Sequence, residues 1–348
     1  MDSLTQIVLG AAVGEAVLGK KIGNKAILWG AIAGTIPDLD VLFIGDDTIR
    51  ELTIHRGFSH SIVFAILIAP LLGWVVNWIY RKNREVDFMT WSWFFFWTIF
   101  THPLLDSLTT YGTQLFLPFS DYRVSLSSIF VLDFFYTVPF LASIIALMFF
   151  SRQDRKRRLL NWIGITVSTS YLVLGLSFKY VAQHKMESSL GSQGIYFTRG
   201  FTSPTPLNII LWSGVFESSD SYYICNYSLL DEPGPITFWR YEKADQLLAG
   251  VSHEYGVERL KWFSDQYYTA TQNQDTITFY TLKFGRHKFE SDSPQGSFAF
   301  YFKIYLDDSG TVTGYENFRE MDSEGIGNLF ERLKSRVLGH KDAYSQLN

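Results

Sequence analysis

The chain has 348 residues, of which 47% are hydrophobic and 17% aromatic, so it is long enough for two domains and too apolar for general disorder. Residues 1–181 carry 15 Lys and Arg against 13 Asp and Glu, whereas residues 182–348 carry 15 against 21. A nearly neutral first half and an acidic second half exclude nucleic-acid binding as the main role. The single cysteine, Cys225, excludes an intramolecular disulfide.

Six apolar segments stand out in the first half of the chain. The third has twenty consecutive residues without a charge, the length that spans the hydrocarbon core of a bilayer. The first two are rich in glycine and alanine, which favour close helix packing. We therefore predict a mainly α-helical membrane bundle over residues 1–181, with about six apolar helices at residues 4–19, 26–44, 61–80, 88–105, 129–150 and 159–180.

Basic residues are concentrated in alternate loops of this predicted bundle. Short cytoplasmic loops of membrane proteins are enriched in lysine and arginine. Placing these loops in the cytoplasm puts residues 45–60, residues 106–128 and everything after residue 182 on the other side. The basic loop residues are Lys20, Lys21 and Lys25, then Arg81, Lys82 and Arg84, then Arg152, Arg155, Lys156, Arg157 and Arg158.

The second half alternates apolar and polar residues in short runs separated by turn sequences such as DEPGP and DDSG. This pattern is typical of antiparallel strands. We predict strands in LNIILWSGVF, SYYICNYSLL, DTITFYTLKF and SFAFYFKIYL, and helices in VERLKWFSDQYYTATQ and GIGNLFERLKSRVL. Residues 182–348 are thus predicted to form a soluble extracytoplasmic α+β domain with an antiparallel sheet.

The sequence THPLLD places His102 and Asp106 four residues apart, so on a helix both side chains lie on one face and can share a cation. The simpler alternative is that His102 caps an aromatic span and Asp106 is hydrated. Other histidines and aspartates are predicted on the same side of the membrane, and they favour cation binding by this pair.

The sequence HRGFSH contains His55 and His60, which are five residues apart and would lie on different faces of a continuous helix. Gly57 favours a loop, with His60 in the first turn of the next helix and Ser59 or Ser61 available as its cap. Two interfacial histidines beside lipid headgroups are the alternative.

The sequence IPDLD ends an apolar segment with Asp38 and Asp40. Pro37 discourages the preceding residue from continuing the helix, so we predict a helix end at this point. A charge at the centre of a bilayer costs roughly 2.5–3.5 kcal/mol, so these carboxylates need either water or a cation.

Histidines and carboxylates together suit Zn²⁺ or Mn²⁺, because an all-oxygen Mg²⁺ site would not need imidazoles. One or two ions could be held. A bound ion would activate water for attack on an ester or phosphoester, with a remaining aspartate as general base. The predicted metal ligands are Asp38, Asp40, His55, His60, His102 and Asp106.

Glu15 and Asp133 are the candidates for catalytic roles outside the ligand set. At 1.5 Å per residue Glu15 lies roughly 13 Å along its helix from Gln6, so it could belong to an outer layer of the site, a proton path or a deeper site. Asp133 and Arg123 could contact the ligands from outside, and Arg123 could equally contact lipid headgroups.

The ordered motifs MDSLTQ, GEA, IPDLD, HRGFSHS, THPLLDSLTTYGT and PFSDYR resemble the YdjM-like family of bacterial inner-membrane-associated metal-dependent hydrolases over about residues 1–180. This resemblance implies an integral cytoplasmic-membrane protein with the six ligands named above. Many members have histidine where this chain has Gln6, and an amide is a poor zinc ligand. That ligand is therefore dispensable here, or the site holds a different ion or fewer ions.

We accordingly expect a membrane-bound metal-dependent hydrolase that cleaves a lipid ester or phosphoester delivered from the bilayer. The alternative is a non-enzymatic membrane anchor or regulator, with a structural cation and a soluble tail that binds an envelope partner. Transport is disfavoured because the polar residues gather at one end of the bundle.

Overall fold

The computed structural model describes residues 1–82, 85–286, 298, 300–318 and 326–340. The chain divides into two compact units. A helical unit comprises Met1–Gly45, Thr53–Leu176 and Pro206–Asn208, and a sheet unit comprises Asp46–Leu52, Ser177–Thr205 and Ile209–Asn348.

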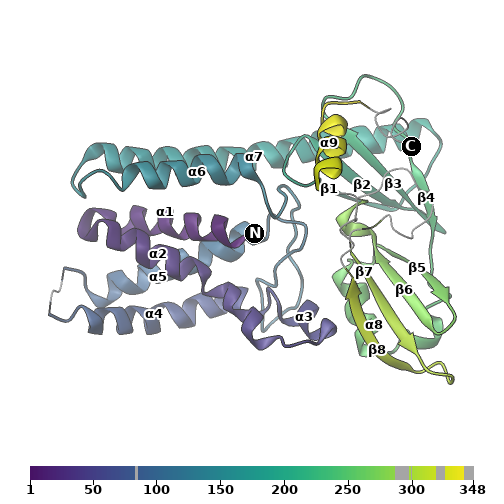
Figure 1. Cartoon of the computed structure of the whole chain (residues 1–348), viewed down its shortest axis with the longest axis horizontal. Coiled ribbons are helices and arrows are strands. Elements are labelled where there is room, and N and C mark those ends of the chain that lie inside the picture. The colour runs from purple at the N-terminus through teal and green to yellow at the C-terminus, as the bar shows by residue number, and fades with distance from the viewer. Residues whose placement is uncertain (83–84, 287–297, 299, 319–325, 341–348) are drawn as a thin grey trace. The chain divides into compact units, whose positions relative to one another are not determined.

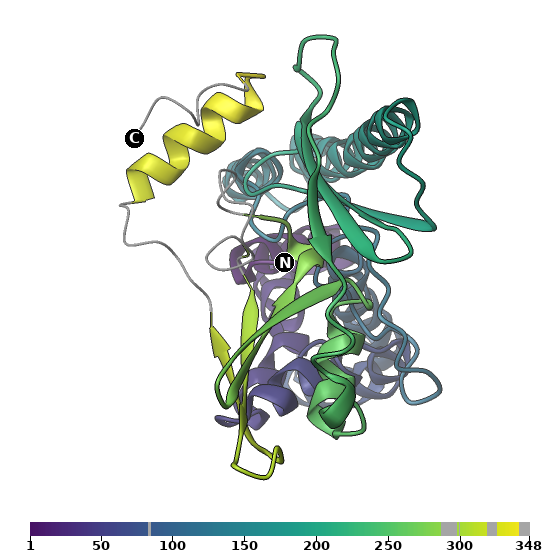
Figure 2. The same ribbon diagram turned by 90° about the vertical axis from the view of Figure 1, so that its right-hand side faces the viewer.

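The long helices of the helical unit run side by side, lengthwise in Figure 1 and nearly end-on in Figure 2. Two apolar cores hold them together, one between α1 and α6 and one among α2, α4 and α5. The helices of this half of the chain are α1 (Ser3–Ile22), α2 (Asn24–Thr35), η1 (Pro37–Phe43), α3 (Thr48–Ile54), η2 (Phe58–His60), α4 (Ile62–Ile79), α5 (Phe88–Asp106), α6 (Phe134–Leu147) and α7 (Arg155–Ser192).

Polar side chains cap the starts of these helices. Asp2, Ser61, Asp87 and Asp133 each accept a hydrogen bond from a backbone amide in the first turn of α1, α4, α5 and α6. Ser61 is therefore the cap of the third predicted segment, accepting from the Phe64 amide at 3.0 Å. The helix end predicted at Pro37 is confirmed, because α2 stops at Thr35 and η1 continues at a bend of 43°.

Glycines bring α1 and α2 into direct backbone contact. A Cβ added at Gly10 would lie 2.3 Å from the carbonyl oxygen of Gly30, and one added at Gly30 would lie 2.2 Å from that of Gly10. Gly34 packs in the same way against Gln6. The expected close packing of the first two apolar segments is thus confirmed, and it brings the end of α2 beside the start of α1.

The expected number of about six apolar spans is wrong. Among the described residues, two helices, Ile62–Ile79 and Arg155–Ser192, are long and apolar enough to cross a membrane, and the bent pair α2 and η1 would make a third. The apolar segment at 129–150 yields α6, which has 14 residues. α1 contains Glu15, Lys20 and Lys21, which interrupt its apolar run.

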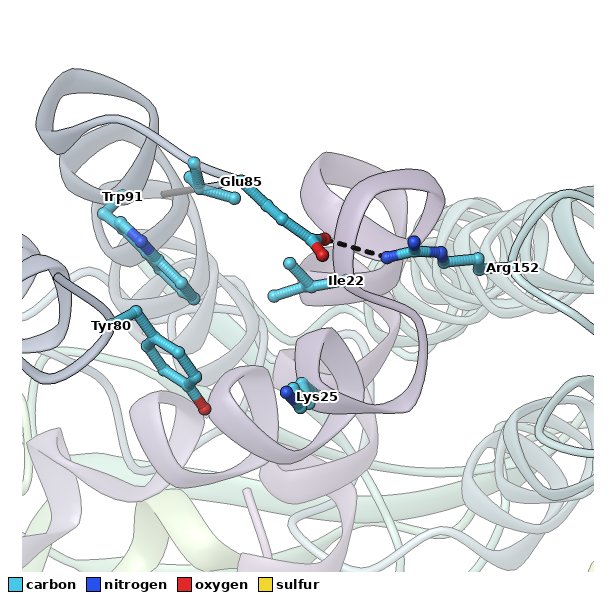
Figure 3. Close-up of a pocket in the computed structure, with 7 residues that line it drawn as sticks. Ile22, Lys25, Tyr80, Glu85, Trp91 and Arg152 are labelled. Carbon is cyan, nitrogen blue, oxygen red and sulfur yellow. Dashed lines mark hydrogen bonds and ion pairs between the residues drawn. The ribbon is translucent and has the colours of Figure 1, made fainter. Parts of the chain in front are cut away.

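The three predicted basic loops meet at one end of the helical unit. The Arg152 guanidinium donates to the carbonyl oxygen of Lys21, and its Nη1 lies 2.9 Å from Glu85 Oε2. Figure 3 shows this ion pair beside a cavity of about 170 Å³ lined also by Lys25 and Tyr80. Arg84, predicted in the same group, lies outside the described residues.

The sheet unit contains two four-stranded antiparallel sheets, ordered β1-β2-β3-β4 and β5-β6-β7-β8. Aromatic and aliphatic side chains from both sheets form one core. The elements are β1 (Arg199–Pro204), β2 (Leu211–Glu217), β3 (Ser221–Ser228), β4 (Trp239–Glu242), η3 (Ala249–Val251), α8 (Tyr255–Phe263), β5 (Tyr268–Asn273), β6 (Thr276–Thr281), η4 (Leu282–Phe284), β7 (Tyr301–Leu306), β8 (Val312–Phe318) and α9 (Ile326–Val337).

The four predicted strand sequences correspond to β2, β3, β6 and β7, although residues 297 and 299 of the last one lie outside the described residues. The helix predicted over VERLKWFSDQYYTATQ is too long, because Asp265 and Gln266 take φ values of 50° and 64° and the chain continues as β5. Cys225 lies in β3, within one of the predicted strands, and burial raises the pKa of its thiol above the usual value.

Candidate metal centre

Four of the predicted ligands meet in one cluster within the helical unit. Asp38 comes from η1, His60 ends η2, and His102 and Asp106 lie in the last turns of α5. One donor atom from each side chain lies within 4.8 Å of every other. Three of the four side chains are 0–1% exposed, and that of Asp38 is 24% exposed. We refer to these four residues as the donor cluster.

Five of the six distances between the donor atoms are close to those expected for ligands of one tetrahedral ion. His60 Nε2 lies 3.4 Å from both Asp38 Oδ1 and Asp106 Oδ2. His102 Nε2 lies 3.3 Å and 3.5 Å from the same two oxygens, and the two Nε2 atoms are 3.2 Å apart. Ligands bound at about 2.0–2.1 Å to a tetrahedral zinc lie about 3.3–3.4 Å from one another. Five of the six edges therefore have the size that one such ion requires.

Hydrogen bonds fix the tautomer of His102. Its Nδ1 lies 2.6 Å from the carbonyl oxygen of Gly34, which can only accept, so the ring proton is on Nδ1. The lone pair of Nε2 therefore points into the donor cluster. The close glycine packing of α1 and α2 places the Gly34 carbonyl where it makes this contact.

His60 is also oriented by hydrogen bonds. Its Nδ1 lies 2.9 Å from Ser59 Oγ, and Ser59 Oγ donates to Asp40 Oδ2 at 3.2 Å. Because the hydroxyl has a single proton, it accepts from His60 Nδ1–H, and Nε2 of His60 is left as a donor to a metal. Metal-bound histidines are commonly held in this way by carboxylates and carbonyl groups.

Asp40 and His55 lie beside the donor cluster and not among its four donor atoms. Asp40 Oδ1 is 3.1 Å from His55 Nδ1, and Asp40 Oδ2 accepts from the Arg56 amide at 2.9 Å. Asp40 thus holds the segment that carries His60. His55 is 23% exposed. Direct metal ligation by these two residues stays a prediction.

Asp106 has one oxygen that is satisfied and one that is available. Oδ1 accepts hydrogen bonds from Gln6 Nε2 at 3.0 Å and from the amino group of Met1. Oδ2 is buried, has no hydrogen-bond partner among the described residues and lies 3.3 Å from Arg56 Nε. A buried carboxylate oxygen without a hydrogen bond, facing two imidazole lone pairs, fits a metal ligand.

Gln6 stands next to the donor cluster. Its Nε2 also lies 3.3 Å from the carbonyl oxygen of His102, and the side chain is fully buried. Within the part of the chain that the structure describes, Oε1 has no hydrogen-bond partner. Gln6 therefore positions Asp106, while the four-donor set is complete without a histidine at this position.

Arg56 is a site residue that the sequence reasoning did not single out. It is 4% exposed, its backbone φ is 56°, and its Nη1 donates to Thr109 Oγ1 at 2.8 Å. The guanidinium lies over the ring of Tyr111, 4.9 Å from its centroid, and Arg123 lies 4.4 Å from the same ring. Its position between the two histidines of HRGFSH is the sequence feature that could have identified it.

Arg123 is buried and donates to the Tyr111 carbonyl at 2.6 Å.

Glu15 and Asp133 do not belong to the donor cluster. Glu15 forms a buried bidentate ion pair with Arg157, at 2.6 Å and 2.7 Å. Asp133 caps α6 and accepts from the Tyr171 hydroxyl at 2.9 Å. Both carboxylates thus have structural partners, and their catalytic roles stay predictions without support from this geometry.

Replacing Asp40 with asparagine should weaken metal binding by about 10–100-fold, as changes in the residues that orient metal ligands do. The amide keeps the size of the side chain but loses the charge that holds His55, Ser59 and the Arg56 amide together. Isothermal titration with Zn²⁺ measures the effect. An affinity equal to that of the unmodified chain would show that Asp40 does not orient His60.

A comparison with known families covers the helical half of the chain. Residues 1–184 match the family of the YdjM inner membrane protein. The protein YfhP of Bacillus subtilis (strain 168) is 31% identical over 155 residues, which cover 41% of this chain and 45% of YfhP. The inner membrane protein YbcI of Escherichia coli (strain K12) is 31% identical over 125 residues, which cover 34% of this chain and 69% of YbcI. No solved structure matches the chain.

Proposed function

The chain belongs to the YdjM inner membrane protein family, and we propose that it is a metal-dependent hydrolase of the bacterial inner membrane that cleaves a phosphoester or lipid ester. The observation that carries this proposal is the donor cluster, in which the Nε2 atoms of both histidines face two carboxylate oxygens and the Nδ1 atoms are held by other partners. Two nitrogens and two carboxylate oxygens suit Zn²⁺ or Mn²⁺.

Asp38 and His55 would have different roles beside the ion. A bound Zn²⁺ or Mn²⁺ ion supplies Lewis acidity to the scissile bond and to the attacking water. Asp38 is the most exposed of the four donors, at 24%, so water and substrate would reach the cluster from its side. His55 is partly exposed, and with Nδ1 held by Asp40 its Nε2 is placed to accept a proton from water.

An apolar surface next to Asp38 supports a lipid or another amphiphile as substrate. Four residues of η1 expose large hydrophobic side chains while Asp40 of the same short helix is buried. Such a surface is favourable for contact with acyl chains and unfavourable in water. The residues are Leu39, Val41, Leu42 and Phe43, which are 48–73% exposed.

The same proposal places the donor cluster and residues 182–348 outside the cytoplasm. The meeting of the basic loops at the end of the bundle that carries Arg152 supports a cytoplasmic location for that end. Alkaline phosphatase fused after Asn348 should therefore be active in cells. Activity of β-galactosidase at that position, with inactive phosphatase, would reverse the orientation.

The decisive experiment compares chelated protein with protein loaded with Zn²⁺ or Mn²⁺ in detergent, on a panel of phosphomonoesters, phosphodiesters and phospholipids. We expect turnover of at least one substrate class by the loaded protein only, and its loss in His60→Ala. A protein that binds no metal and hydrolyses nothing would end the proposal.

A second candidate is the non-enzymatic anchor or regulator with a structural cation. It is favoured by the number of protein donors in the cluster, which is four, since structural zinc sites have four protein ligands and catalytic sites keep an open position. Its expected result in the same experiment is stoichiometric metal, a lower melting temperature after chelation and no hydrolysis of the panel. Under this candidate the sheet unit would bind an envelope partner.

A further inference from the structure

A second polar cavity lies at the end of the helical unit where the basic loops meet. Its volume is about 330 Å³. It is lined by the last turns of α1 and the first two turns of α7, and Arg152 borders it as well as the cavity in Figure 3. Its lining contains five cationic side chains, the carboxylates of Glu15 and Asp154, and the amide of Asn161.

Two of the five cations in this lining already have partners. Arg157 uses Nε and Nη2 for Glu15, and its Nη1 donates to Asn24 Oδ1 at 2.7 Å and to the Phe150 carbonyl at 3.1 Å. Arg152 is paired with Glu85.

The remaining cations, Lys20, Arg155 and Arg158, are exposed and have no ion-pair partner in the part of the chain that the structure describes. Their positive charges face a concave space, whose low-dielectric walls strengthen the field that acts on an anion.

Asn161 adds a buried acceptor to the same cavity. The residue is 1% exposed, and its Nδ2 donates to the carbonyl oxygen of Ala12 at 3.1 Å. Its Oδ1 is buried and accepts no hydrogen bond from any residue that the structure describes. Buried polar atoms are nearly always paired, so a hydroxyl or ammonium donor from a ligand would satisfy it.

The cavity lies at one end of a candidate membrane span. α7 is apolar and long enough to cross a bilayer, and the cavity is lined by its first residues. Trp162, also in the lining, is 52% exposed. Exposed tryptophans are typical of the interface between acyl chains and headgroups, so the cavity lies at the depth of lipid phosphates.

We propose that this cavity binds the headgroup of an anionic phospholipid that carries free hydroxyls, as phosphatidylglycerol does. The phosphate lies among Lys20, Arg155 and Arg158, and a headgroup hydroxyl donates to Asn161 Oδ1. Basic pockets between helices on the cytoplasmic side are known to hold anionic headgroups. The site is independent of the donor cluster, because its residues on α1 lie at the opposite end of that helix from Gln6.

The test is a titration of the full-length chain in detergent, followed by native mass spectrometry, with phosphatidylglycerol and with phosphatidylcholine of the same acyl chains. We expect one tightly bound phosphatidylglycerol. The double variant Arg155→Gln/Arg158→Gln should bind it roughly 30-fold more weakly, since each cation near a phosphate contributes about a factor of five. Lys20→Gln should show a smaller loss in the same direction.

The matched control is Arg81→Gln/Lys82→Gln, which removes two exposed positive charges from the loop between α4 and α5 without touching the cavity. It should bind phosphatidylglycerol as the unmodified chain does. Equal weakening in both double variants would show diffuse surface attraction and overturn the proposal. Equal binding of phosphatidylcholine, or displacement of the lipid by inorganic phosphate, would overturn it as well.

Discussion

His102→Ala should reduce the affinity of the protein for Zn²⁺ by more than about 100-fold, beyond the loss expected for a residue that only orients a ligand. The substitution removes a donor that lies 3.2–3.5 Å from the other three donor atoms. It also removes the ring N–H that donates a hydrogen bond to the buried Gly34 carbonyl. Metal analysis of the detergent-purified protein, after dialysis against a fixed free Zn²⁺ concentration, measures the loss.

His253→Ala is the matched control, because that imidazole is 75% exposed and belongs to the sheet unit. It should leave the metal content unchanged. Circular dichroism and size-exclusion chromatography establish that both variants are folded. If folded His102→Ala retains one equivalent of metal, the four donor atoms do not form the binding site.

Glu15→Ala should lower the free energy of unfolding by about 3–5 kcal/mol, the cost of removing one partner from a buried ion pair. Glu15 and Arg157 side chains are 5% and 3% exposed, and the variant leaves the guanidinium charge buried with only Asn24 and a carbonyl oxygen as partners. Thermal unfolding in detergent, followed by circular dichroism, measures the change.

The double variant Glu15→Leu/Arg157→Met separates charge from packing. It removes both charges and keeps apolar volume, so it should recover most of the stability that Glu15→Ala loses. Unaltered turnover per folded molecule in the double variant would give Glu15 a structural role. Loss of turnover with stability intact would support the proton path that the sequence suggested for Glu15.

Local sequence patterns predicted helix ends correctly where interactions between residues close in the sequence determine them. Pro37 ends α2, and Ser61 caps α4, because proline geometry and a cap hydrogen bond involve only neighbouring residues. The helix predicted from Val257 ends before Asp265, because Asp265 and Gln266 have positive φ and the chain then enters β5, whose pairing partner, β6, lies later in the chain.

Membrane spans were overpredicted because apolar content alone does not distinguish a lipid-facing helix from one buried among other helices. Trp91, Phe94 and Phe95 of α5 are at most 2% exposed and pack against α2 and α4. Their hydrophobic side chains form a protein core, which sequence hydropathy counts in the same way as a lipid contact.

The sequence by itself determined which residue types could bind a metal, and it grouped them in three motifs on one predicted side of the bundle. The tertiary structure alone decided that Asp38, His60, His102 and Asp106 form the donor cluster, with Asp40 and His55 beside it. It also paired Glu15 with Arg157, which is 142 residues away. The physical reason is that spacing along a helix or turn limits only neighbouring side chains, whereas the convergence of three segments, η1, η2 and α5, depends on backbone contacts such as that of Gly10 with Gly30.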